Sequence, residues 1–112
     1  DVYALGCLAF ELFTGRALFE AESDIALGGM HQAHDGRPPR LLTLARDPEL
    51  APLVEWLSSC LRKDPAARTA VEQLARDLVP VYAVLTLRTW PLPLADTEDE
   101  TGLTPAGRFA YT

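Results

Sequence analysis

Histidine and serine side chains are the residues of this 112-residue chain whose types and spacing could do chemistry. His31 and His34 lie three residues apart, so on a helix they would share one face and could bind a metal ion together. No third ligand is evident nearby, and solvated surface histidines are therefore the favoured interpretation. Ser58 and Ser59 have no accompanying base motif, so we interpret them as helix-surface residues rather than nucleophiles.

The two cysteines, Cys7 and Cys60, lie far apart, each inside an apolar stretch. They have neither the paired spacing of a zinc site nor the density of a disulfide-rich scaffold. We therefore expect buried, reduced thiols. These residues give the chain no predicted metal site, cofactor site or catalytic residue of its own.

Length and composition limit the class of protein. At 112 residues the chain suits one modest domain, and 48% apolar with 23% charged residues is ordinary for a globular protein. The net charge of -6 opposes binding to nucleic-acid phosphates. No stretch approaches the ~20 apolar residues that cross a bilayer, so we expect a cytoplasmic protein. Because the chain opens on Asp1 and an apolar segment follows at once, we expect a fragment or a processed piece.

The elements that must position these side chains begin with a helix over 2–14. This segment is apolar at every position except Gly6 and Glu11, so the helix has no polar face and is predicted to be buried and central. Asp1 suits its N-cap, because the carboxylate can accept hydrogen bonds from free backbone amides of the first turn. Gly15 supplies the left-handed residue with which many helices end.

The segment 23–34 has a weaker helical pattern. Its two interior glycines, Gly28 and Gly29, cost roughly 1 kcal/mol each relative to alanine, so this helix is predicted to be peripheral and mobile. Residues 35–39, with the sequence DGRPP, are predicted to form a turn and an extended connector.

Two more helices are predicted further along the chain. Apolar residues recur at helical spacing over 48–62, with a start near Pro52 as an alternative, and they are Leu50, Leu53, Val54, Leu57 and Leu61. The sequence DPAAR at 64–68 interrupts this pattern. Thr69 and Glu72 form a predicted capping box for the last helix, and its inner stripe is predicted to be Val71, Leu74, Ala75 and Leu78. Pro80 is expected to end or kink that helix.

The C-terminal part has no amphipathic period. Prolines beyond Leu87 favour extended backbone, and residues 96–100 hold four acids in five positions. We predict a helical region over 1–84 and a flexible linker or tail over 85–112. The predicted fold class is all-α, with about four helices, one of them buried and central, plus an extended tail.

Two blocks of sequence together suggest a family. Residues 1–15, DVYALGCLAFELFTG, resemble the central helix of the C-terminal lobe of protein kinases, whose pattern has Asp, Leu-Gly, Glu and often Thr-Gly. Residues 60–68, CLRKDPAAR, are similar to the helix-to-loop junction near the end of the same lobe. The resemblance covers about residues 1–80, and bacterial serine/threonine kinases of eukaryotic type are the most similar branch. It departs from the family pattern at Thr69-Ala70, where Pro then Ser or Thr is usual, and at Leu18-Phe19, where Pro-Phe is usual.

The resemblance implies roles for three residues. Asp1 would support the catalytic loop of an intact kinase through hydrogen bonds to its backbone, with a plain N-cap as the alternative. Arg68 would pair with the glutamate that closes the activation segment, with a surface arginine as the alternative. Glu11 would face basic side chains of a substrate, with a structural partner as the alternative.

The resemblance also implies what the chain does. The Gly-rich loop, the lysine of the third strand, the catalytic-loop Asp and Asn, and the metal-binding Asp of Asp-Phe-Gly are all absent from these 112 residues. The expected parent is an ATP-dependent serine/threonine protein kinase that uses Mg²⁺ and acts on protein hydroxyls. This piece is expected to be inactive alone; a non-catalytic interaction module or a pseudokinase remnant is the alternative.

The implied partners are the upstream kinase segments and a protein substrate, with no nucleic acid and no membrane segment. The segments that cover part of the 2–14 helix in a kinase would precede Asp1. Apolar surface should therefore remain exposed on this helix, and self-association should follow.

Overall fold

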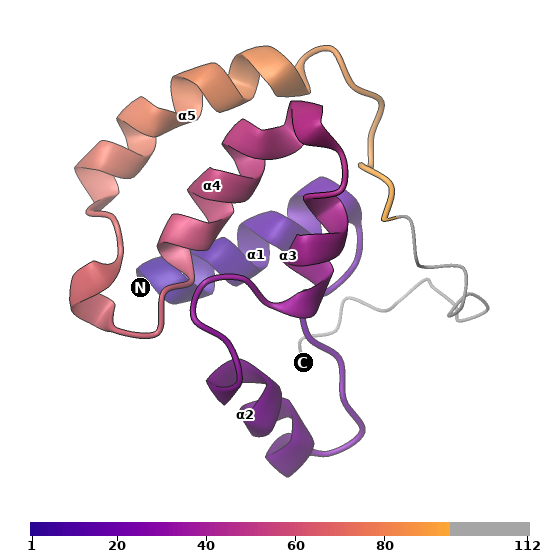
Figure 1. Cartoon of the computed structure of the whole chain (residues 1–112), viewed down its shortest axis with the longest axis vertical. Coiled ribbons are helices and arrows are strands. Elements are labelled where there is room, and N and C mark those ends of the chain that lie inside the picture. Colours follow the sequence, from indigo (N-terminus) through magenta and orange to yellow (C-terminus); the bar gives the residue numbers. More distant parts are fainter. Residues whose placement is uncertain (95–112) are drawn as a thin grey trace.

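The structure, a computed structural model, describes residues 1–94, and within them every regular element is helical. The chain runs from α1 to α5 with two short 3₁₀ segments, η1 and η2, between them (Figure 1). The bounds of the elements are α1 Val2–Thr14, α2 Asp24–Gln32, α3 Pro39–Leu44, η1 Pro48–Leu50, α4 Ala51–Cys60, η2 Pro65–Ala67 and α5 Val71–Leu85. This architecture confirms the predicted all-α class. No helix of the described part is long and apolar enough to span a membrane.

The core is organised around α4. This helix packs against α1, α3 and α5, and α5 arches over it (Figure 1). Its apolar residues recur at helical spacing and are almost fully buried, among them Leu53, Leu57 and Cys60. The contact with α5 includes the indole Nε1–H of Trp56, which donates to the carbonyl oxygen of Leu74 at 3.0 Å.

The first helix has the predicted caps at both ends. The Asp1 carboxylate accepts a hydrogen bond of 2.8 Å from the amide of Tyr3. Gly15 is left-handed, with φ 75°, and its N–H donates to the carbonyl of Glu11 at 2.8 Å. Gly6 allows close packing, since a Cβ there would lie 2.8 Å from the Cβ of Cys60.

The composition of this helix predicted burial on every side, and that prediction is wrong. Phe10 is fully buried against the core, whereas Leu5, Leu8 and Leu12 are exposed, the last by 69%. The physical reason is that α4 covers only one side of α1. Exposed apolar surface on this helix confirms the expectation drawn from the resemblance, and self-association stays a prediction.

The second helix is peripheral, as predicted. None of its nine residues is buried, and it projects away from the other helices (Figure 1). The Ser23 hydroxyl caps it by accepting a hydrogen bond from the amide of Ala26 at 3.1 Å. Its mobility stays a prediction.

The short helix α3 was not predicted. Pro38 and Pro39, which indicated an extended connector, instead start this helix, with Pro39 at its first position. Proline suits that position because its missing N–H would have no partner in the helix there. Leu41 and Leu44 are buried and attach α3 to the core. The single helix predicted over 48–62 is in the structure two elements, the 3₁₀ segment η1 and the helix α4.

The start of α5 differs from the prediction. Its N-cap is Ala70, and no side chain caps it, so the proposed capping box of Thr69 and Glu72 is wrong. The amide of Thr69 instead donates to the carbonyl of Ser59 at 3.3 Å, which draws this residue toward α4.

The buried stripe of α5 is also shifted along the helix. Leu74 is buried as predicted, but Val71, Ala75 and Leu78 are exposed, and the stripe continues through Val81 and Leu85. Pro80 does not end the helix. It lies on an exposed turn, where the carbonyl that loses its helical partner can bind water instead.

Residues 88–94 return to the core. The amide of Leu92 donates to the carbonyl of Phe13 at 2.8 Å, and Leu92 and Leu94 are buried. Trp90 lies beside Phe13, with ring centroids 5.6 Å apart. This packing differs from the expected free tail, because alternate residues of an extended chain share one face and here that face meets α1. The rest of the predicted tail, 95–112, lies outside the described residues.

Candidate functional site

Asp1 and Arg68, which come from the two family-like blocks, meet at the start of α1. The nearest guanidinium nitrogen of Arg68 lies 3.9 Å from the Asp1 carboxylate, and the guanidinium lies over the Tyr3 ring, 5.0 Å from its centroid. Arg68 also donates to the carbonyls of Arg62 and Lys63 at 2.7 and 3.3 Å. Its side chain is 17% exposed and therefore partly buried. The sequence did not predict the contact between these two residues.

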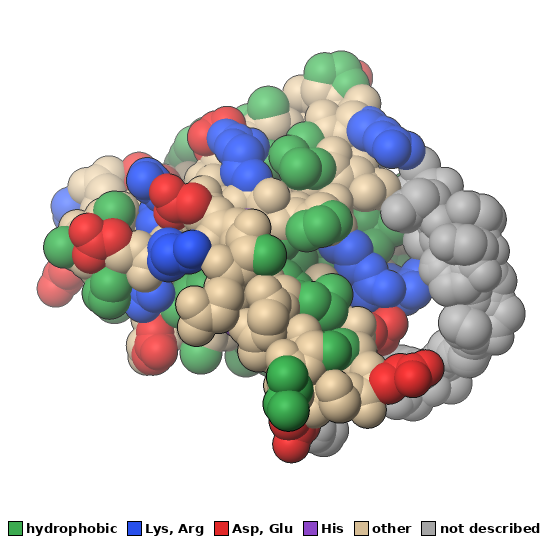
Figure 2. Space-filling view, turned by 60° about the horizontal axis from the view of Figure 1, so that its bottom comes forward, with side chains coloured by type: hydrophobic (Ala, Val, Ile, Leu, Met, Phe, Trp, Pro, Cys, Tyr) green, Lys and Arg blue, Asp and Glu red, His purple; other side chains and the backbone are tan. Residues whose placement is uncertain are grey.

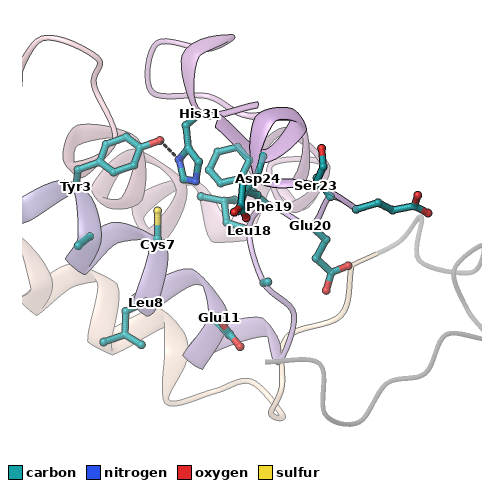
Figure 3. Close-up of a pocket in the computed structure, with 15 residues that line it drawn as sticks. Tyr3, Cys7, Leu8, Glu11, Leu18, Phe19, Glu20, Ser23, Asp24 and His31 are labelled. Atoms are coloured by element: carbon teal, nitrogen blue, oxygen red, sulfur yellow. Dashed lines mark hydrogen bonds between the residues drawn. The ribbon is translucent and has the colours of Figure 1, made fainter. Parts of the chain in front are cut away.

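Tyr3 also lines a groove of about 1040 Å³ (Figure 3). One wall is the side of α1 that carries Tyr3, Cys7, Leu8 and Glu11. The opposite wall is the segment 17–24 and the adjoining part of α2. Its apolar lining includes Leu18, Phe19 and Leu27.

Four carboxylates line this groove. Glu11 contributes from α1 and is 6% exposed, whereas Glu20, Glu22 and Asp24 lie on the opposite wall. Arg40 holds Glu20, at 3.1 Å between the charged atoms. Glu11 and Asp1 are ten residues apart on α1, about 15 Å along the helix axis, so the structure does not bring them together. The face of the molecule drawn in Figure 2 carries charges of both signs, interspersed with hydrophobic side chains.

His31 lines the groove at the end that contains Tyr3, and His34 contacts the same tyrosine. The Tyr3 hydroxyl oxygen lies 2.9 Å from Nδ1 of His31 and 3.1 Å from Nε2 of His34. The Phe19 ring packs on both imidazoles, with centroids 4.2 and 5.5 Å away. The prediction of solvated surface histidines is therefore wrong: both are half-buried and hydrogen-bonded, because α1 and the 17–24 segment pack against them. Residues 1–94 contain no group of three or more His, Cys, Asp or Glu placed to hold a metal ion.

Tyr3 and Phe19 are the site residues that sequence reasoning missed. Tyr3 carried a usable signal, since a hydroxyl on an otherwise apolar helix needs a polar partner when it is buried. Burial raises the pKa of Tyr3 to about 12, with a contribution from Cys7, and Arg68 opposes this shift. The hydroxyl is therefore neutral and able to donate at neutral pH.

The thiols and serines offer no activated nucleophile. Burial raises the pKa of Cys7 and of Cys60 to about 11, so both stay protonated at neutral pH. Both are reduced, as predicted, although Cys7 is only half-buried. Ser59 donates to the carbonyl of Trp56 at 2.7 Å. Ser58 is buried rather than on the helix surface, because it packs against the close backbone of Gly36.

Several curated proteins have sequences similar to this chain, and three of them are named as kinases of one type. A serine/threonine-protein kinase, PkaA, of Streptomyces coelicolor is 42% identical over 78 residues, which is 70% of this chain and 13% of that protein. A probable serine/threonine-protein kinase, PknB, of Corynebacterium glutamicum is 35% identical over 80 residues, or 70% of this chain and 12% of that protein. The serine/threonine-protein kinase PknB of Mycolicibacterium smegmatis is 37% identical over 84 residues, or 73% and 13%. The homologues of this chain are bacterial serine/threonine protein kinases.

These kinase homologues confirm the resemblance seen in the two sequence blocks. The chain spans only 12–13% of the length of the kinases it matches. No family model matches the chain. No solved structure matches it either.

Proposed function

We propose that this chain is a helical part of the C-terminal lobe of an ATP-dependent serine/threonine protein kinase, where it supports the active site and borders the protein substrate. The observation that carries the proposal is the meeting of the two kinase-like blocks at one place: Arg68, from the second block, binds beside Asp1 and Tyr3, from the first. Similarity to kinases over about 70% of the chain supports the same conclusion.

The chemistry in this proposal belongs to the whole kinase. ATP and Mg²⁺ would be bound by segments outside these 112 residues, and together they would supply and activate the transferred phosphoryl group. Asp1 and Arg68 would fix neighbouring kinase segments, in a protein that acts in the cytoplasm. The chain alone would then neither bind nor hydrolyse ATP, and a titration of it with Mg-ATP should give no saturable binding.

Glu11 is proposed to face basic side chains of the protein substrate. It lines the groove together with the carboxylates of the opposite wall, which favours cationic over anionic segments in that space. The apolar lining would receive neighbouring hydrophobic side chains of the same segment. Structural support for the active site and contact with substrate would thus be separate tasks at separate places on α1.

A segment exchange tests the proposal. Residues 1–84 would replace the homologous segment of the Streptomyces coelicolor kinase PkaA, and transfer of phosphate from ATP to a protein substrate would be measured. We expect an active chimera, with strong loss of activity on Asp1→Ala and little change on the control Asp77→Asn, which lies exposed on α5 away from the groove. A chimera that folds and binds ATP but transfers no phosphate, whatever the state of Asp1, would contradict the proposal. It would instead favour a non-catalytic interaction module or a pseudokinase remnant.

A further inference from the structure

The hydrogen bonds around Tyr3, His31 and His34 determine which atom donates and which accepts in each of them. The backbone N–H of Gly36 donates to Nδ1 of His34 at 2.9 Å, so that nitrogen carries no proton. A neutral His34 then has its proton on Nε2, from which it donates to the Tyr3 oxygen at 3.1 Å. The Tyr3 hydroxyl proton is left to donate to Nδ1 of His31 at 2.9 Å. The links from Gly36 and from Tyr3 need an unprotonated Nδ1 on His34 and on His31, so both imidazoles are neutral in this arrangement.

A proton added to either imidazole removes an acceptor. On His34 it would place an N–H opposite the N–H of Gly36, and on His31 it would leave the Tyr3 hydroxyl proton without its acceptor. Gly36 cannot retreat easily, because it is left-handed, with φ 91°, and packed tightly on α4. A Cβ at this glycine would lie 3.1 Å from the Ser58 carbonyl oxygen.

The segment that can move is α2, since it has no buried residue and His31 lies in its last turn. We propose that Tyr3, His31 and His34 form a pH-sensitive clasp that holds α2 beside the groove at neutral pH and releases it on acidification. Because α2 forms part of one wall of the groove, the clasp controls the shape of that wall (Figure 3). The inference concerns conformation alone and does not depend on the proposed kinase activity.

The groups around the clasp agree with this direction. Burial lowers the pKa of His31 and, most strongly among several causes, that of His34. His31 and Lys63 lower the pKa of His34 further, and Asp35 opposes them. The other titratable or charged groups on the elements that pack here are Arg68 over the Tyr3 ring, Asp1 beside it and Arg62 against Gly36. The groove adds Cys7, Glu11, Glu20, Glu22 and Asp24.

The sign of the pH effect follows from these shifts. A histidine whose pKa is lower in the clasped state binds protons more readily once released, so acid favours release. The clasp is complete above the ordinary histidine pKa of 6.5 and is lost as the pH falls through the lowered values. Tyr3 keeps its proton throughout this range, since its pKa is about 12.

The unmodified 112-residue chain gives the first test. Nitrogen-15 NMR at pH 7.5 should show both imidazoles protonated at Nε2 and bare at Nδ1. Between pH 7.5 and pH 5, protection of the α2 amides, corrected for intrinsic exchange, should fall about fivefold relative to α4, as expected when one hydrogen bond of typical net strength is lost. Protection of α2 that follows α4 at every pH, or a proton on Nδ1 of either histidine at pH 7.5, would overturn the proposal.

Matched variants then assign the effect to the clasp. His34→Asn keeps an acceptor for Gly36 but does not titrate, so the pH-dependent loss of α2 protection should shrink. Tyr3→Phe removes the bridging hydroxyl and should leave α2 poorly protected at both pH values. The control Tyr82→Phe makes the same chemical change at an exposed position on α5 and should behave like the unmodified chain. An unchanged pH response in His34→Asn would overturn the assignment, and this variant leaves Tyr3 intact.

Discussion

Helices α4 and α2 are nearly equal in length, at ten and nine residues, and both contain several apolar side chains. Six residues of α4 are buried, whereas α2 buries none and Ile25 at its start is 90% exposed. In α4 the leucines recur on one side, and three helices pack against it. In α2 two glycines interrupt the apolar side, so little surface is available to bury. Apolar content alone therefore does not decide which of two short helices carries the core.

The difference also separates two tasks. The core around α4 fixes where α1 lies and therefore where Asp1, Tyr3 and Glu11 point. The second helix and the 17–24 segment attach to that frame mainly through Tyr3, Phe19 and the two histidines. A stable support and an adjustable groove wall can coexist in one small chain because they rely on different contacts.

Truncating one leucine in each helix should give the largest contrast. Leu57→Ala in α4 removes a fully buried side chain and should cost about 2–5 kcal/mol of the free energy of unfolding. Leu27→Ala in α2 changes a half-buried side chain and should cost less than about 1 kcal/mol. Urea unfolding of the two variants measures both values, and equal losses would mean that α2 belongs to the core.

Adding one methyl group should have opposite effects in α1 and α2. The new Cβ in Gly6→Ala would lie 2.8 Å from the Cβ of Cys60, a clash worth about 1–3 kcal/mol that exceeds the gain in helix propensity of about 1 kcal/mol. Gly28→Ala meets no atom within 4 Å and should instead stabilise α2 by up to about 1 kcal/mol. Urea midpoints for Gly6→Ala and amide exchange of α2 for Gly28→Ala test the two signs. A stabilised Gly6→Ala variant would show that α1 and α4 pack less closely than described.

The contact between α4 and α5 should show a smaller loss. Trp56→Phe removes the hydrogen bond to the Leu74 carbonyl and part of a buried ring, at an expected cost of about 1 kcal/mol or somewhat more. Trp90→Phe is the control, because that indole is half exposed and rests on Phe13 at the edge of the core. Denaturant unfolding followed by circular dichroism compares the two, and a larger loss at Trp90 would contradict the central place of α4.

How much of this fold the sequence could predict depends on the strength of each local signal. The dense apolar run of α1 and its caps, Asp1 and Gly15, were predicted because each has a local physical cause. The six-residue α3 was not, since it is too short for a helical period and begins with prolines that also suit a connector. The docking of Leu92 and Leu94 was missed because two alternating leucines are too few to identify a face.

The candidate site was harder to predict than the fold. The family resemblance indicated Asp1, Glu11 and Arg68, but nothing local indicates that Arg68 binds beside Asp1, 67 positions away in the sequence. Tyr3 was counted as one more apolar residue of α1, although its hydroxyl oxygen joins two histidines about thirty positions away. Contacts between distant segments are set by packing, and a single sequence contains no direct record of them.

Substitutions on the outer face of α1 should have the smallest effect on the free energy of unfolding and the largest effect on self-association. Leu5 and Leu12 are exposed on a helix whose other side is buried. Gln has nearly the same helix propensity as Leu. Replacing both leucines with Gln should therefore change the free energy of unfolding by at most about 0.5 kcal/mol per site. In this respect the outer face of α1 resembles α2 rather than α4. We expect the unmodified chain to self-associate through this face and the Leu5→Gln/Leu12→Gln variant to shift toward monomer. Leu87→Gln, which changes an exposed leucine just after α5, is the control and should leave association unchanged. Sedimentation over a wide concentration range measures the difference, and a clean monomer for the unmodified chain would remove the case for association through α1.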